Sequence, residues 1–136
     1  MSAPDARRWL AYADLDLDAA EHTASTGHLA PQIGCYHAQQ AVEKALKAIL
    51  ILLQIRFPFT HDLDELRDLI PVGWDLKQQH PDLSELSQWA VEARYPGNWR
   101  DAAEADAHNA AAQARTVVES VLRDLEQHGF DAQGSR

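Results

Sequence analysis

Only one cysteine, Cys35, occurs in the 136 residues, so the chain can form neither an internal disulfide nor a thiolate metal site. This usage suits a reducing compartment, and we expect a cytoplasmic protein with no metal or other cofactor. The longest apolar run, residues 48–53, is far too short to cross a membrane, and the opening residues do not form a signal-peptide pattern. The sequence therefore predicts a soluble protein without membrane contact.

Positive charge is also scarce, because 12 Lys and Arg face 21 Asp and Glu, for a formal net charge of -9. Non-specific binding to nucleic acid depends on clustered Lys and Arg, so any contact with RNA has to be local. The sequence contains no glycine-rich phosphate loop, no paired Cys-x-x-Cys and no His-Glu-x-x-His motif. These absences exclude several enzyme classes.

Hydrophobic residues recur instead at the three-to-four-residue spacing of helices, and no window shows the alternation of a β-strand. The first predicted helix covers residues 5–26 and ends at Gly27. The second begins at Pro31 and continues to about Gln54. A short third helix, residues 61–70, is expected to have Thr60 as its cap.

Two capping-box pairs begin the remaining predicted helices. Asp82 with Glu85 begins the fourth, which ends at Pro96-Gly97, and Asp101 with Glu104 begins the last, which continues to about His128. The last helix carries small residues along one seam, so we expect it to pack closely against the second helix, in an antiparallel or near-parallel orientation. With 46% hydrophobic residues, the chain suits one core. The predicted fold is an all-α bundle of about four to five helices with short connections, forming a single domain over residues 1–136.

Polar residues interrupt the second helix at regular spacing. Gln40, Lys44 and Lys47 fall at i, i+4 and i+7 and share one face. The two lysines can bind a nucleotide phosphate, or they can cover apolar surface with their stems while the ammonium reaches water or an acid. Glu43 and Lys47 form an i, i+4 pair in the favourable order, worth about 0.2–0.5 kcal/mol on a surface.

Other candidate residues lie further along the chain. His61 can transfer a proton or complete the start of the third helix. Arg94 and Tyr95 follow the fourth helix directly, where they can form a phosphate site, although Arg94 can equally pair with an acid such as Asp62. His108 can face the same cleft as Arg94, or it can lie exposed on the last helix.

Three blocks of sequence, residues 38–48, 57–63 and 94–96, together resemble a prokaryotic HEPN domain, and the resemblance extends over about residues 8–125. It implies an antiparallel up-and-down helical bundle, frequent homodimerisation, and nucleotide or RNA binding. It also implies a small nucleotidyltransferase as partner, often in a toxin and antitoxin pair. The residues assigned to nucleotide or partner binding are Gln40, Lys44, Lys47, His61, Arg94 and Tyr95.

Many HEPN domains are metal-independent ribonucleases with an arginine and a histidine four to six residues apart. In this chain the first histidine after Arg94 is His108, fourteen residues on. The alternative function is therefore a ribonuclease toxin in which folding or dimerisation brings His61 or His108 beside Arg94. The histidine would move a proton from the ribose 2′-hydroxyl, and the arginine would stabilise phosphate charge.

Overall fold

Three long helices form the body of the protein in a computed structural model that describes residues 2–92 and 101–132. They are α1 (Ser2–Thr26), α2 (Pro31–Leu52) and α7 (Glu104–Gln127). Four short helices lie between α2 and α7: α3 (Leu63–Leu69), α4 (Leu76–Gln79), α5 (Ser84–Ser87) and α6 (Trp89–Glu92). The described ranges contain no strand, which confirms the all-α prediction. No helix within them is both long and apolar enough to span a membrane.

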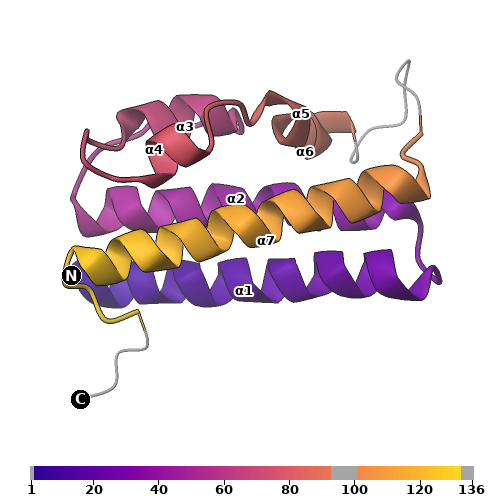
Figure 1. The fold of residues 1–136 in the computed structure, drawn as a ribbon, viewed down its shortest axis with the longest axis horizontal. Helices are drawn as coiled ribbons and strands as arrows, with labels where there is room; N and C mark the ends of the chain where they lie inside the picture. The colour runs from indigo at the N-terminus through magenta and orange to yellow at the C-terminus, as the bar shows by residue number, and fades with distance from the viewer. Residues whose placement is uncertain (1, 93–100, 133–136) are drawn as a thin grey trace.

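The chain runs up and down along the bundle (Figure 1). α1 and α2 are antiparallel, the segment α3–α6 returns along α2, and α7 then runs in the same direction as α2. Gly27 has a φ of +69° and ends α1 where the sequence predicted. The predicted up-and-down bundle is therefore confirmed, with α3–α6 as its broken third segment. The expected contact between α2 and α7 is also present, in the near-parallel orientation.

Small residues let the three long helices approach one another closely. At Gly34 of α2, an added Cβ would lie 3.1 Å from Thr23 Cγ2 of α1 and 3.6 Å from Ala107 Cβ of α7. Buried alanines continue these contacts, and the seam predicted on the last helix is buried from Ala107 to Leu125. α2 thus lies at the centre of one continuous hydrophobic core.

The boundaries of the short helices differ from the prediction. The cap of α3 is Asp62 and not Thr60, because Asp62 Oδ1 accepts hydrogen bonds from the backbone N–H of Asp64 (3.0 Å) and Glu65 (3.2 Å). The Thr60 hydroxyl accepts from the N–H of Asp62 itself. The helix α4 was not predicted from the sequence.

The predicted fourth helix is divided into α5 and α6, and Asp82 does not form the expected capping box. Its carboxylate accepts from the backbone and the hydroxyl of Ser84. Contacts with α3 compete with a continuous helix here, because the N–H of Leu83 donates to Asp64 Oδ1 and the hydroxyl of Ser87 accepts from the N–H of Leu63.

The capping box predicted for the last helix does not form. α7 begins at Glu104 with Ala103 as its N-cap, and Asp106 Oδ2 accepts from the N–H of Ala103 at 2.8 Å. Asp106 thus supplies the half of the motif predicted for Glu104, two residues further along the chain, while Ala103 has no side-chain oxygen to supply the other half.

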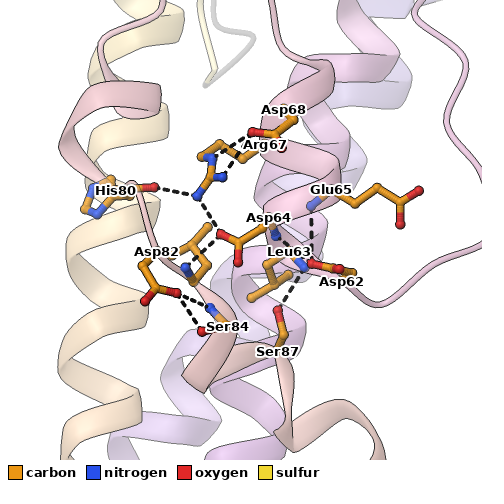
Figure 2. Close-up of polar contacts among 11 residues, drawn as sticks. Asp62, Leu63, Asp64, Glu65, Arg67, Asp68, His80, Asp82, Ser84 and Ser87 are labelled. Atoms are coloured by element: carbon orange, nitrogen blue, oxygen red, sulfur yellow. Dashed lines mark hydrogen bonds and ion pairs between the residues drawn. The ribbon is translucent and has the colours of Figure 1, made fainter.

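Arg67 ties α3 to the chain that follows it (Figure 2). Its guanidinium donates to Asp64 at 2.5 Å, to Asp68 at 3.0 Å and to the backbone carbonyl of His80 at 2.9 Å. The side chain is buried, with 8% of the residue exposed. Asp64 also accepts from the N–H of Leu83, so this one ion pair links α3 to both ends of the segment between α4 and α5.

Candidate functional site

Two buried carboxylates organise the polar face of α2. The first is Asp16 of α1, which lies across from α2 and is only 9% exposed. Its Oδ1 lies 2.9 Å from Nδ1 of His37, and its Oδ2 accepts from Nζ of Lys44 at 2.5 Å. Asp16 therefore fixes a histidine and a lysine that lie two helical turns apart on α2.

The second carboxylate is Glu43 of α2, which is 4% exposed. Its Oε1 accepts from Nε2 of Gln39 at 2.9 Å and lies 2.9 Å from Nδ1 of His61, while its Oε2 accepts from Nζ of Lys47 at 2.8 Å. Gln39 also donates to the backbone carbonyl of His61 at 3.2 Å. Glu43 thus holds the loop that precedes α3 against the middle of α2.

Burial alone would raise the pKa of Glu43, because a charged carboxylate loses its hydration. Hydrogen bonds from Lys47, Gln39 and His61 outweigh this effect, and the pKa of Glu43 falls below its ordinary value. The carboxylate is therefore ionised at neutral pH. The predicted Glu43 to Lys47 pair is confirmed, but it is buried, so the small energy expected of a surface pair does not apply to it.

The two lysines of this face have different surroundings. Lys47 is buried, and its ammonium lies 5.7 Å from the ring centroid of Trp9 and 5.4 Å from that of Phe57. Lys44 keeps about a quarter of its side chain exposed beside Asp16. Lys47 is consequently enclosed by its acid and two aromatic rings, whereas Lys44 remains accessible from solvent.

Both histidines bound to these acids have the same arrangement. An ionised carboxylate only accepts hydrogen bonds, so Nδ1 of His61 and Nδ1 of His37 carry the proton that each shares with its acid. The side chain of His61 is 29% exposed and that of His37 is 33% exposed. In the neutral form, Nε2 of each ring is then an acceptor for a proton.

The structure brings together three of the residues that the sequence singled out. Gln40, Lys44 and Lys47 lie on α2 as predicted, and His61 joins Lys47 through Glu43, whereas Lys44 pairs with Asp16. Gln40 Nε2 donates to Oε1 of its neighbour Gln39 at 2.7 Å, which connects it to the same network.

His108 does not lie near this network. It is exposed near the start of α7, next to Ala107, which packs against Gly34. Gly34 precedes Glu43 by nine residues on α2, a rise of about 13 Å. The candidates Arg94 and Tyr95 lie outside the described residues.

A pocket of about 380 Å³ adjoins the network at the N-terminal half of α1. Lys44 contributes to it from α2, and the other lining residues share one face of α1. They are Asp5, Arg8, Trp9 and Tyr12. The pocket combines two aromatic rings with two cations and one acid.

Sequence reasoning missed the contributions of α1 and of His37. Arg8 and Tyr12 stand at i and i+4, a spacing that would have placed them on one face of a helix. Asp16 and His37 carry no such local signal, because they meet only through the packing of α1 on α2.

Comparison with known proteins identifies the family. Residues 6–125 match the HEPN domain. No curated protein matches the chain. Among solved structures, the chain is similar to the crystal structure of TT1696 from Thermus thermophilus, with 25% sequence identity and a TM-score of 0.71. The similarity covers 88% of this chain and 98% of that chain. The chain therefore belongs to the HEPN domain family.

Proposed function

We propose that this chain is a cytoplasmic HEPN subunit that forms a homodimer, binds a nucleotide or RNA, and partners a small nucleotidyltransferase in a toxin–antitoxin type system. The observation that carries the proposal is the polar face of α2, where Asp16 and Glu43 each hold one lysine and one histidine. Membership of the HEPN family supports the class of ligand.

Stability alone does not account for such a face. Replacing a buried ion pair by apolar residues of similar volume is often neutral or stabilising. The pairs are therefore better explained by the lysine and histidine groups that they hold in place for a ligand. Lys44, His37 and His61 each keep part of the side chain accessible while the acids beneath them are buried. Fixed cations and histidines of this kind suit a phosphate and its neighbouring hydroxyl groups.

The partner and dimer parts of the proposal are supported by apolar side chains that remain exposed on the two long N-terminal helices. Leu15 of α1 is 62% exposed, and Ile33 of α2 is 39% exposed. A second copy or a partner protein would remove such surface from water. The overall acidity of the chain also favours a protein partner over a long nucleic acid.

Fluorescence anisotropy with a labelled short single-stranded RNA and with labelled nucleotides tests the ligand. Lys44→Gln is expected to weaken binding by about tenfold or more, because a charged hydrogen bond to phosphate is lost. Lys77→Gln, on α4, is the matched control and is expected to leave affinity unchanged. Wild-type protein that binds neither probe would contradict the proposal.

A tagged chain expressed at its native level tests the partner. Mass spectrometry is expected to identify a small nucleotidyltransferase in near-equal amount, and sedimentation of the pure chain is expected to give a species of twice 15.2 kDa. Recovery without a nucleotidyltransferase would contradict the partnership, and a 15.2 kDa species at micromolar concentration would contradict the dimer.

The hydrogen bond between Glu43 and His61 favours ribonuclease activity as a second candidate function. A buried acid that orients a histidine is the arrangement that a general base requires. Metal-free cleavage of total RNA is expected to fall at least about a hundredfold in His61→Gln and in Arg94→Ala, with His22→Gln, an exposed histidine of α1, as control. His108→Gln then distinguishes the two candidate histidines. Absence of cleavage by the wild-type protein would exclude this function.

A further inference from the structure

The pocket at the N-terminal half of α1 adjoins the acid-centred contacts on α2 and shares Lys44 with them. Four of its lining residues, Asp5, Arg8, Trp9 and Tyr12, follow the i, i+3, i+4, i+7 spacing of one helical face. We infer that this pocket binds a single nucleoside 5′-phosphate, with the base against Trp9 and Tyr12 and the phosphate on Arg8 and Lys44. The inference rests on the proposed function and names its ligand and its site.

The aromatic side of the pocket suits a nucleobase. Tyr12 is 52% exposed, so a ligand can reach its ring. Trp9 is partly buried, and its ring is supported by the ammonium of Lys47 at 5.7 Å from the centroid. One ring is therefore anchored and the other is accessible, as a stacking surface requires.

The cationic side of the pocket suits a phosphate. Arg8 is exposed and forms no hydrogen bond or ion pair with another residue in the described part of the chain, whereas Arg67 and Arg115 are both bound by acids there. Lys44 is held in place by Asp16 at 2.5 Å. A guanidinium that is not neutralised beside a fixed ammonium is a favourable arrangement for a terminal phosphate group.

The size and charge of the pocket fit one nucleotide. A volume of about 380 Å³ is in the range of small-molecule sites. Asp5 lies in the wall and would repel a second phosphate, while its carboxylate can accept from a sugar hydroxyl or a base amino group. The same chemistry is offered by a free nucleotide and by the 5′-terminal nucleotide of an RNA strand.

Isothermal titration of the full chain with AMP, GMP, CMP and UMP, and with a 5′-phosphorylated and a 5′-hydroxyl RNA octamer, tests the inference. We expect saturable binding of a 5′-phosphorylated ligand that weakens about tenfold or more in Arg8→Gln and in Tyr12→Ala. Both residues are exposed, so a thermal melt is expected to show that the variants remain folded. Arg56→Gln, an exposed arginine outside the pocket, is the matched control.

The two sources of the ligand give different results. Binding of a mononucleotide but of neither octamer assigns a free nucleotide, and binding of the 5′-phosphorylated octamer but not the 5′-hydroxyl octamer assigns an RNA end. Equal binding of both octamers would overturn the inference, since the phosphate then plays no part. Binding that falls in Lys44→Gln but not in Arg8→Gln or Tyr12→Ala would overturn it while leaving the proposed function intact. Absence of binding to any ligand would overturn both.

Discussion

Replacing Glu43 with alanine is expected to lower the free energy of unfolding by about 3–5 kcal/mol, because it leaves a buried lysine without its acid. Within the described part of the chain, Glu43 is the acid that pairs with Lys47, and it also accepts from Gln39 and His61. Lys47 and His61 lose this acceptor at once, and Gln39 keeps only the backbone carbonyl of His61. Urea unfolding at pH 7 measures the effect, and Glu126→Ala, an exposed acid of α7, is the control. A loss below about 1 kcal/mol would be that of an ordinary surface change and would contradict this account.

The pH dependence of the same site gives a second measurement of this effect. The pKa of Glu43 is lower in the folded chain than its ordinary value of 4.5, so its contribution to stability is complete above pH 4.5. The contribution is lost as the pH falls through the folded pKa, where the carboxylate takes up a proton. The difference in stability between wild type and Glu43→Gln is therefore expected to shrink below pH 4.5. A constant difference from about pH 7 to about pH 3 would contradict the ionic role.

The long helices could be predicted because their signals are local. Gly27 ends α1, Pro31 begins α2, and the small residues of α7 form a seam that is visible at helical spacing. The segment between α2 and α7 could not be predicted in the same way. Its helix boundaries depend on hydrogen bonds such as that from Leu83 to Asp64, which join residues 19 positions apart. Such contacts override local propensity.

The candidate site likewise combines features with a local sequence signal and features that depend on long-range contacts. The shared face of Gln40, Lys44 and Lys47 follows from one helical period, and the structure confirms the pairing of Lys47 with Glu43. The sequence did not reveal that Lys47 is buried, because burial depends on Trp9 from α1 and on Phe57 from the loop after α2.

The acid that pairs with Lys44 could not be predicted from neighbouring residues in the sequence either. Asp16 is 28 residues away from Lys44 in the sequence and reaches it only when α1 packs on α2. A helical period places residues on a face, but it does not say which element that face meets. The roles assigned to Arg94 and Tyr95 remain predictions, since both residues lie outside the described ranges.

Removal of the Arg67 guanidinium is expected to be nearly as damaging as removal of Glu43. Arg67→Met keeps most of the apolar stem but leaves the carboxylate of Asp64 and the carbonyl of His80 without a donor they now share (Figure 2). Because hydrogen bonds to charged groups contribute about 1.5–3 kcal/mol each, the expected loss in the free energy of unfolding is about 2–4 kcal/mol. Urea unfolding measures this loss, with Arg123→Met, an exposed arginine of α7, as control.

Hydrogen exchange then locates the damage caused by Arg67→Met. Arg67 connects α3 only to the chain before α5, whereas α1, α2 and α7 pack through the apolar core. Amide protection is therefore expected to fall first in residues 63–87 and to persist in the three long helices, since segments open according to their own contacts. Arg67→Lys should restore part of the protection, because an ammonium can still donate to Asp64 but cannot reach all three acceptors in the fork geometry of a guanidinium. An equal loss of protection in all helices would show instead that α3–α6 unfolds together with the rest of the bundle.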